Sequence, residues 1–553
     1  MNPAPAMVPE VDPDLPRQHD VSHRRRGQSG PDGLGSWPWR RARISPDRTA
    51  LRDGARTLTY ADLATRTALL AGALRRRGLR PGERVAYLGV NAVEVFETFF
   101  ATCLAGGVWV PLNYRLSGTE IRYMLDDCGA AFLVHSADTD ALLASAGPLA
   151  DTVREVFAVS PGTCPLDGRD YHAELTGAAK LSDGVDVQLD DAAVLLYTSG
   201  TTGRPKGAVL THGNLTWNTV NQLAHVDVLS TDRALCVAPL FHCVGLGQVT
   251  LPTLFKGGSV EPVARFDPGE VLATIARRAI TSFSAVPTML QLMCDHPAWA
   301  GTDLSSLTHV LYGGSPVPHR VATAWQDRGL RVLQGYGMTE AAPGVCMAVA
   351  DGAGERPVSV GVPHFFTDIA HLRDSRPVPA TGGRSGELLV RGPNVFAGYW
   401  GRPRESADAF VDRDWYRSGD VVRIDRAGWA TVVDRVKDLI ISGGENIYPA
   451  EVEAVLLGLD GIADAVVVAA PDERWGEVGA AYVVLRTGAV LDEDAVRRHL
   501  AGRLSRYKLP KHVRFVAELP RTATGKVRRG ELRHDAQRLA GTPAPANPPG
   551  GAS

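Results

Sequence analysis

The stretch YTSGTTGRPKG, residues 197–207, lies between two short apolar runs at residues 192–196 and 208–210. Each run has the composition of a buried strand, so the sequence predicts a loop that joins two strands. Its glycines let backbone N–H groups turn toward an anion, its hydroxyls add donors, and Lys206 adds a positive charge. A flexible surface turn would not need three threonines, a serine and a lysine. The stretch therefore predicts a phosphate-binding loop.

This loop differs from a Walker loop. The Walker motif requires Gly-Lys followed by Ser or Thr at the start of a helix. Here Pro205 precedes Lys206 and Gly207 follows it. The nucleotide and the reaction therefore have to be inferred from other parts of the chain.

Helix-like and strand-like segments alternate on both sides of the loop. Helical periodicity marks residues 60–76, 92–105, 271–278 and 321–328, and strand-like runs occupy residues 84–88, 108–112, 282–286 and 310–312. Such alternation is typical of an α/β fold with largely parallel sheets. From about Gly386 short strands and turns predominate, which indicates a small β-rich subdomain. After a charged break at residues 434–438, about 100 residues outline a separate compact unit.

Composition excludes several classes of function. The chain has 553 residues, 44% hydrophobic and 22% charged, with a formal net charge of -2, so no long-range field would recruit nucleic acid or an anionic membrane. Its seven cysteines form no CxxC pair, which favours reduced, mostly buried thiols over disulfides or a metal site. No run approaches the roughly 18 apolar residues of a spanning helix, and the first residues lack a secretory signal. We expect a cytoplasmic enzyme.

Three further clusters carry chemistry. QGYGMTE (residues 334–340) supplies an aromatic face for adenine, a hydroxyl for phosphate and a carboxylate for Mg²⁺. WYRSGD (residues 415–420) places an aspartate where it can accept from ribose hydroxyls, and PRTATGKV (residues 520–527) places a lysine on a turn. Taken singly, Glu340, Asp420 and Lys526 are better explained as a solvated loop carboxylate, an Asx-type turn residue and a surface lysine.

Together, in this order and with these separations, the four clusters resemble the AMP-forming adenylating superfamily, which contains acyl-CoA and aryl-CoA synthetases, luciferases and the adenylation domains of peptide synthetases. The resemblance runs from about residue 57 to 529 and includes PLFH (239–242), YGGSP (312–316) and DRVKD (434–438). IISGGENIYP (440–449) and PDERWGE (471–477) are similar to the forms that acyl-CoA synthetases carry. Asp434 stands where many relatives have glycine, a variant that also resembles fatty acyl-CoA synthetases.

The resemblance implies an architecture and a reaction. We expect a disordered arm (1–36), a large N-terminal domain (37–433) of two α/β subdomains with a β-rich subdomain at about 345–433, a hinge (434–438), a mobile α+β C-terminal domain (439–538) and a disordered tail (539–553). A carboxylate would attack the α-phosphorus of Mg-ATP and release pyrophosphate. The thiol of CoA would then take the acyl group from the acyl-adenylate, after the C-terminal domain has rotated about Lys437.

The resemblance also implies residue roles. Lys526 would bridge the acid carboxylate and the α-phosphate, Lys206 and Thr339 would hold phosphate, and Glu340 and Thr198 would bind Mg²⁺; these are the implied catalytic and metal residues. Tyr336 would line adenine, and Asp420 and Arg435 would bind ribose. The implied nucleotide-binding residues are Thr198, Ser199, Gly200, Thr201, Thr202, Gly203, Lys206, Gly313, Gly314, Ser315, Tyr336, Gly337, Met338, Thr339, Asp420, Arg435 and Lys526. The implied CoA path comprises Gly443, Gly444, Glu445 and Trp475.

The acid-pocket residues implied by the resemblance are mostly apolar and include several small ones: Phe241, His242, Val244, Gly245, Val286, Gly313, Tyr336, Met338 and Ala342. They predict an acid with an apolar body, and a short to medium fatty acid and an aryl or cinnamoyl-type acid both remain open. His242 is either a gate of this pocket or a satisfied buried histidine.

Two other functions remain alternatives. The activated group could pass to an amine, or nitrite could be activated for N–N bond formation, instead of thioester formation. A nucleotide-binding protein without chemistry would lack Lys526, Glu340 or Asp420, and all three are present. As partners we expect a small-molecule carboxylic acid, no nucleic acid and no membrane span, and a homodimer is one expectation for the assembly.

Overall fold

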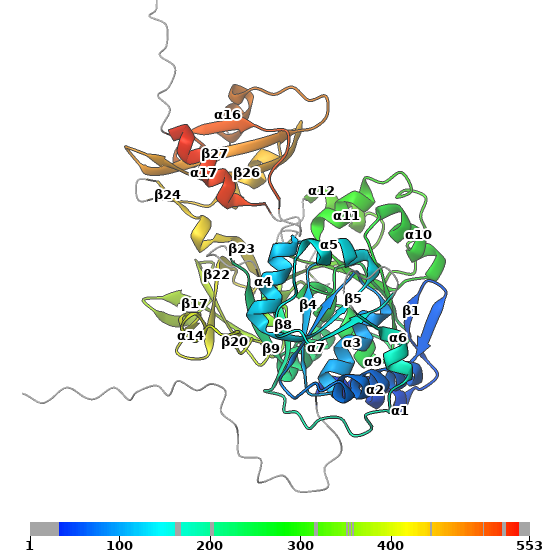
Figure 1. The fold of residues 1–553 in the computed structure, drawn as a ribbon. Coiled ribbons are helices and arrows are strands. Elements are labelled where there is room, and N and C mark those ends of the chain that lie inside the picture. The colour runs from blue at the N-terminus through cyan, green and yellow to red at the C-terminus, as the bar shows by residue number, and fades with distance from the viewer. Residues whose placement is uncertain are drawn as a thin grey trace, which may run out of the picture.

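The strands that flank the phosphate-loop stretch belong to one sheet of the computed structural model, which describes residues 33–160, 168–198, 204–314, 319–349, 352, 356, 359–442, 445–501, 503–521 and 527–540 (Figure 1). Strands β8 and β9 pair antiparallel, and Thr198 lies opposite Lys206. Strand order in this first sheet is β20 (Gly398–Tyr399), β9 (Lys206–Thr211), β8 (Ala192–Thr198), β4 (Val108–Leu112), β3 (Arg84–Leu88), β5 (Ala130–His135), β6 (Glu155–Ala158) and β7 (Arg169–Asp170). Strands β8, β4, β3, β5, β6 and β7 run parallel, as the alternating pattern predicts.

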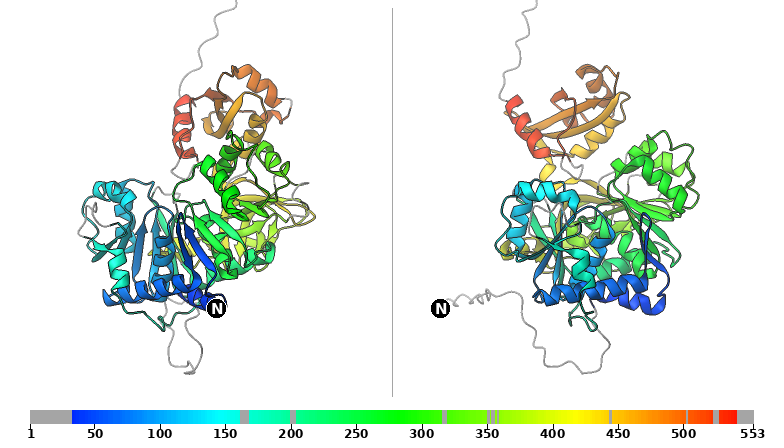
Figure 2. Two further views of the ribbon diagram at one scale, coloured as in Figure 1. Left: turned by 90° about the vertical axis from the view of Figure 1, so that its right-hand side faces the viewer. Right: turned by 45° about the vertical axis from the view of Figure 1, so that its right-hand side comes forward.

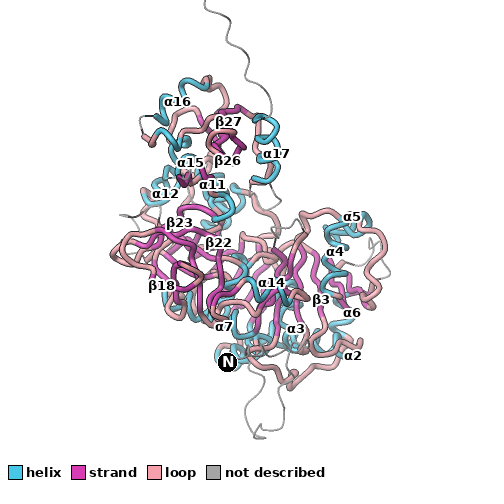
Figure 3. The backbone as a smooth tube through the Cα atoms, turned by 90° about the vertical axis from the view of Figure 1, so that its left-hand side faces the viewer, coloured by secondary structure: helices cyan, strands magenta, loops and turns pink. Residues whose placement is uncertain are grey.

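Helices flank this sheet (Figure 3), and several of them begin at side-chain caps. Thr59, Ser117 and Thr211 each form a capping box with the residue three positions on, at the starts of α2, α4 and α7. The bounds are α1 (Trp37–Ile44), α2 (Tyr60–Arg76), α3 (Val93–Leu104), α4 (Gly118–Cys128), η3 (Ala137–Thr139), α5 (Asp140–Ser145), α6 (Tyr171–Thr176) and α7 (His212–His225).

A second sheet follows the first along the chain. Its order is β16 (Val362–Pro363), β15 (Gly344–Met347), β14 (Val332–Gly337), β13 (His309–Tyr312), β12 (Ser282–Ala285), β10 (Arg233–Cys236), β11 (Ser259–Pro262), β1 (Thr49–Asp53) and β2 (Arg56–Thr59). Its helices are α8 (Cys243–Gly247), α9 (Thr250–Lys256), α10 (Pro268–Arg278), α11 (Pro287–Cys294) and α12 (His319–Gln326). One buried apolar cluster includes Trp109 of the first sheet, Val260 of the second, and Phe99, Leu215 and Leu254 from helices α3, α7 and α9. The two sheets therefore share a core.

A smaller antiparallel sheet comes next. It contains β17 (Asp368–Arg373), β18 (Arg376–Pro379), β19 (Ser385–Arg391), β21 (Phe410–Val411), β22 (Trp415–Ile424) and β23 (Ala430–Arg435), with α14 (Pro403–Asp408) before β21. This sheet corresponds to the predicted β-rich subdomain from residue 368 onward. Strands β15 and β16 lie within the predicted range but extend the second sheet, because β15 pairs with β14 and β16 pairs with β15.

The C-terminal part stands apart from this body, as the orange and red ribbon in Figures 1 and 2 shows. Its sheet contains β24 (Ile440–Ser442), β25 (Glu445–Ile447), β26 (Ile462–Asp472), β27 (Gly476–Leu485) and β28 (His512–Phe515). Around it lie α15 (Pro449–Leu457), α16 (Glu493–Ala501), η6 (Arg506–Lys508) and α17 (Arg529–Ala540). The short helix η5 (Val436–Asp438) links it to β23, and the Arg533 guanidinium donates to the carbonyl of Lys437 over 2.9 Å and pairs with Asp438.

The structure moves two predicted boundaries. The arm was predicted to extend to Ser36, but η2 (Leu34–Ser36) is buried, and Leu34 is 0% exposed. Helix α17 reaches Ala540, past the predicted end of the C-terminal domain at residue 538. Among the helices in the described ranges, none combines the length and the apolar character needed to cross a lipid bilayer.

Candidate active site

Lys206 and Glu340 lie on two sides of one tyrosine. The Tyr399 hydroxyl donates to Glu340 Oε1 over 2.9 Å, and the ammonium of Lys206 lies 5.5 Å from the centre of the Tyr399 ring. Burial and the neighbouring carboxylate raise the pKa of Tyr399, so its hydroxyl keeps the proton that it donates. Strand β20 carries Tyr399 into place by pairing with β9, where Tyr399 lies opposite Ala208. The structure thus brings together two residues predicted to bind phosphate and Mg²⁺.

Charged residues surround Lys206 on its outer side. They line an open hollow of about 350 Å³ together with Tyr123. Lys206 Nζ lies 2.7 Å from Glu405 Oε2, and Arg402 pairs with Asp127 over 2.6 Å. The guanidinium of Arg204 stands 5.7 Å from the centre of the Tyr123 ring. The predicted phosphate lysine is therefore held by a carboxylate in this conformation.

Tyr336, Asp420 and Arg435 form the second group of predicted nucleotide residues. The Tyr336 hydroxyl donates to Asp420 Oδ2 over 2.6 Å, and Arg435 Nε lies 3.1 Å from Asp420 Oδ1. Burial, with Asp420 beside it, raises the pKa of Tyr336 well above its ordinary value. Strands β22 and β23 place Asp420 directly opposite Arg435. An aromatic face, a carboxylate and a guanidinium therefore meet, although the three residues come from separate clusters of the sequence.

Thr339 lies at the end of β14, in the short helix η4 (Thr339–Ala341). Its hydroxyl is 3.7 Å from Cys243 Sγ, at the first residue of α8. Before it, Gly337 can carry no side chain, because a Cβ would lie 1.7 Å from the carbonyl oxygen of Pro343. Met338, between them, packs against the apolar core.

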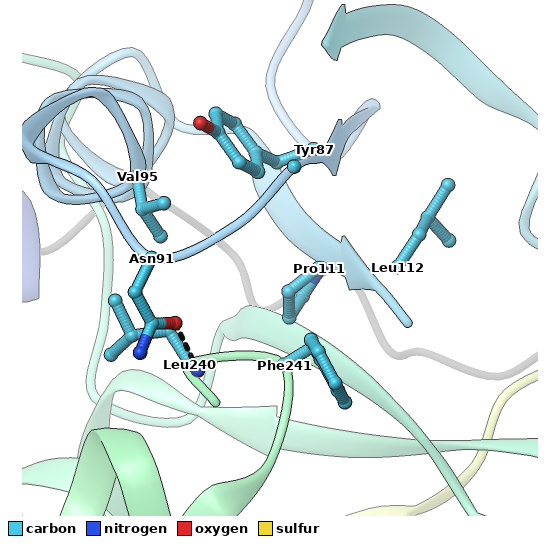
Figure 4. A pocket seen from close by; sticks show the side chains of 8 residues that line it. Tyr87, Asn91, Val95, Pro111, Leu112, Leu240 and Phe241 are labelled. Atoms are coloured by element: carbon cyan, nitrogen blue, oxygen red, sulfur yellow. Dashed lines mark hydrogen bonds between the residues drawn. The ribbon is translucent and has the colours of Figure 1, made fainter. Parts of the chain in front are cut away.

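Several of the predicted acid-pocket residues lie on or beside helix α8. Phe241 and His242 precede it with ring centres 4.6 Å apart, and Val244 and Gly245 belong to it. Asn91 anchors the loop before Phe241: its Oδ1 accepts from the backbone N–H of Leu240 over 2.9 Å (Figure 4), and its Nδ2 donates to the carbonyl of Ala238 over 3.0 Å. A cavity of about 10 Å³ lies behind Phe241, between Tyr87, Pro111 and Leu112 (Figure 4).

Gly313, another predicted pocket residue, packs closely against its neighbours. A Cβ on Gly313 would lie 2.8 Å from the carbonyl oxygen of Gly335 and 3.3 Å from Gln248 Nε2. Val286 lies beside Gly314, where a Cβ would be 3.9 Å from its Cγ1. Ala342 is fully buried, and its carbonyl oxygen would be 2.7 Å from a Cβ on Gly247 of α8. Phe241, Gly313 and Ala342 therefore border the same helix.

Residues 38–400 match the family model described as AMP-binding enzyme, and residues 451–526 match the AMP-binding enzyme C-terminal domain. The chain belongs to the AMP-binding enzyme family. It is 50% identical to a feruloyl-CoA synthase from Amycolatopsis over an alignment of 505 residues. The alignment covers 91% of this chain and 98% of the synthase. It is 40% identical to an indoleacetate–CoA ligase from Aromatoleum aromaticum, over 90% and 97% of the two chains. An o-succinylbenzoate CoA synthetase structure from Bacillus subtilis, in complex with its acyl-adenylate intermediate, matches with a TM-score of 0.80 and 32% identity, over 90% and 98%.

The AMP-binding enzyme offers a single carboxylate where Mg²⁺ is predicted. Within the described part of the chain, no group of three or more His, Cys, Asp or Glu side chains could hold a metal ion. Mg²⁺ in nucleotide sites is commonly held by one or two carboxylates together with substrate phosphates. Glu340, with its carboxylate fixed by Tyr399, fits that role.

Several predicted residues of the enzyme lie outside the described ranges: Ser199, Gly200, Thr201, Thr202, Gly203, Ser315, Gly443, Gly444 and Lys526. Their roles stay predictions. Of the predicted CoA path, Glu445 begins β25, and Trp475 is 46% exposed beside the guanidinium of Arg474. Ser442 pairs with Gly476, so Trp475 lies close to the β24–β25 hairpin. Lys437 lies in η5, at the predicted hinge.

The motifs of the enzyme did not reveal Asn91, Gln248, Tyr399 or Glu405. Each acts on a residue far away in the sequence, and none belongs to the motifs that indicated the site. The charged run at residues 402–405, which contains Glu405, was an available signal.

Proposed function

We propose that this AMP-forming acid:CoA ligase activates an aryl carboxylic acid of the cinnamate type. The observation that carries the proposal is the 50% identity to a feruloyl-CoA synthase along 98% of that protein. The indoleacetate–CoA ligase relative adds a second aromatic acid. Neither name involves an amine acceptor or nitrite, so the alternatives with other acceptors are not favoured.

The pocket walls support an aromatic body over a long alkyl chain. Among the predicted pocket residues, Gly313 has no side chain, and Phe241 adds a ring whose centre lies 5.3 Å from that of Tyr114. A glycine leaves room for a planar ring, and aromatic side chains pack favourably against one.

The residues of the chain would share the first half-reaction as follows. Lys206 and Thr339 would bind phosphate oxygens, and Asp420 would accept from the ribose hydroxyls. Mg²⁺, held by Glu340, would neutralise charge that develops on the phosphates. Lys526 would bring the acid carboxylate to the α-phosphorus. The new acyl–AMP bond makes AMP the leaving group, and the CoA thiol then displaces it from the acyl carbon.

A pyrophosphate-release assay over ferulate, cinnamate, indoleacetate and octanoate, run with and without CoA, tests the proposal. We expect the cinnamates to have a kcat/KM at least tenfold above that of octanoate, and mass spectrometry to find their CoA thioesters. A preference for octanoate would contradict the aryl assignment. Release of pyrophosphate without any consumption of CoA would contradict the ligase assignment.

A further inference from the structure

Gln248 carries a buried acceptor that the fold leaves unused. The residue directly follows α8 and is 7% exposed. Its side-chain oxygen Oε1 is buried and accepts no hydrogen bond from the described residues. Buried polar atoms in native proteins are nearly always paired, so an unpaired one requires a reason.

The amide of Gln248 lies in the wall of the predicted acid pocket. Its Nε2 is 3.3 Å from the position of a Cβ on Gly313 and 3.2 Å from that of a Cβ on Gly335. Both glycines therefore let their backbone pack closely against the amide. A larger side chain at either position would contact the amide directly.

The backbone that presents Gln248 is held from two sides. The Thr250 hydroxyl donates to the carbonyl of Gly245 over 2.5 Å. Asn218 of α7 donates through Nδ2 to the carbonyl of Gly247 over 2.9 Å, and its Oδ1 accepts from the N–H of Gly344 over 3.1 Å. The unpaired oxygen therefore belongs to a fixed segment.

The position of Gln248 along helix α8 sets its distance from the chemistry. Cys243, at the start of the helix, contacts the Thr339 hydroxyl at the predicted phosphate end. Gln248 stands five residues later, which corresponds to a rise of about 7.5 Å. That length suits an aromatic ring joined to a carboxylate by two carbons, with the far edge of the ring at Gln248.

We propose that Gln248 Oε1 accepts a hydrogen bond from a hydroxyl on the ring of the acid, and so selects hydroxylated aryl acids. An amide oxygen is purely an acceptor, and a phenolic hydroxyl is a donor of matching geometry. An acid without the hydroxyl leaves the oxygen unpaired, which disfavours its binding. The inference rests on the proposed aryl-acid function and adds the substituent that the pocket recognises.

The test compares 4-hydroxycinnamate with cinnamate in the full-length enzyme. Gln248→Leu removes the acceptor at similar volume, and we expect the ratio of kcat/KM values, hydroxylated over unsubstituted, to fall about tenfold. The KM for ATP should stay the same. Gln326→Leu, an exposed glutamine at the end of α12, is the matched control and should keep the wild-type ratio.

An unchanged ratio in Gln248→Leu would overturn the inference, and so would an equal loss for both acids, which would indicate a structural role. If the leucine variant fails to fold, Gln248→Met is judged by the same ratio. The proposed function fails separately, when the wild-type enzyme forms a CoA thioester with neither cinnamate. A wild-type preference for the hydroxylated acid that survives in both variants refutes only the role of Gln248.

Discussion

The ion pair between Lys206 and Glu405 should weaken the binding of ATP. Lys206 Nζ lies 2.7 Å from Glu405 Oε2, and their side chains are 15% and 45% exposed. A lysine that holds phosphate must leave this carboxylate when ATP binds. Glu405→Gln removes the competitor and should therefore tighten ATP binding. Arg402, 4.0 Å from the same oxygen, keeps its partner Asp127 in the variant.

The size of the effect follows from the exposure of the pair. Ion pairs between solvent-exposed side chains contribute about 0.2–1 kcal/mol, and the exposure of Glu405 places this one within that range. Because 1.4 kcal/mol corresponds to a factor of ten, the Kd for ATP should fall by about 1.4- to fivefold. Salt screens both the pair and the phosphates, so the difference between variant and wild type should shrink at about 1 M salt.

Isothermal titration with a non-hydrolysable ATP analogue measures this Kd. Glu451→Gln is the control, since Glu451 forms a closely matched pair with Lys508 in the C-terminal part, at 2.7 Å with side-chain exposures of 39% and 18%. The control should bind the analogue as the wild type does. An unchanged or weaker affinity in Glu405→Gln would refute the idea that the carboxylate competes with phosphate for Lys206.

Three further outcomes are expected. Lys526→Ala should lower acid-dependent pyrophosphate release by a factor on the order of 10², while thioester formation from supplied acyl-adenylate survives; near-normal pyrophosphate release would remove Lys526 from the chemistry. Trp325→Ala should lower the free energy of unfolding by about 3–5 kcal/mol in chemical denaturation, because Trp325 is fully buried against Trp299 and Phe283, with ring centres 4.7 and 5.9 Å away. Burial lowers the pKa of His364 to about 3, below the ordinary value of 6.5, so the unfolded chain binds the proton more readily and stability should be lost as pH falls from about 6.5 toward 3. The urea concentration at the unfolding midpoint, measured across that pH range, should decline less steeply in His364→Gln than in the wild type. Equal slopes in the two proteins would contradict this prediction.

Local periodicity was sufficient to predict many elements. The helix at Tyr60–Arg76 and the strands at Arg84–Leu88 and Val108–Leu112 are confirmed with the predicted bounds, and the mixed α/β fold class is confirmed. Each of these segments is decided by its own pattern of buried side chains. The predicted β-rich subdomain at about 345–433 included the residues of β15 and β16, which extend the second sheet instead, because a strand's partner depends on distant residues that its own pattern does not reveal.

The same limit applies to the candidate site. Motifs indicated Glu340, Asp420 and Lys206, whose residue types are themselves the chemical signal. The contacts that hold these residues come from Tyr399, Arg435 and Glu405, and pairing of β20 with β9 and of β22 with β23 brings them near. Gln248 could not be predicted, because its significance lies in an Oε1 atom that has no hydrogen-bond partner among the described residues, which becomes visible only when the surrounding backbone is in place.

The pairing of Asp420 with Arg435 would connect the proposed ribose binding at Asp420 to the orientation of the C-terminal part. Arg435 is the last residue of β23 and immediately precedes η5, the short helix that connects β23 to the C-terminal part. Ribose hydroxyls that donate to Asp420 would compete with the Arg435 guanidinium for Oδ1 and with the Tyr336 hydroxyl for Oδ2. The binding of a nucleotide would then break the contact between Arg435 and Asp420 at the end of β23, and its release would restore that contact. Through this contact, the order of the two half-reactions would be coupled directly to the rotation of the C-terminal part, without a separate regulatory site.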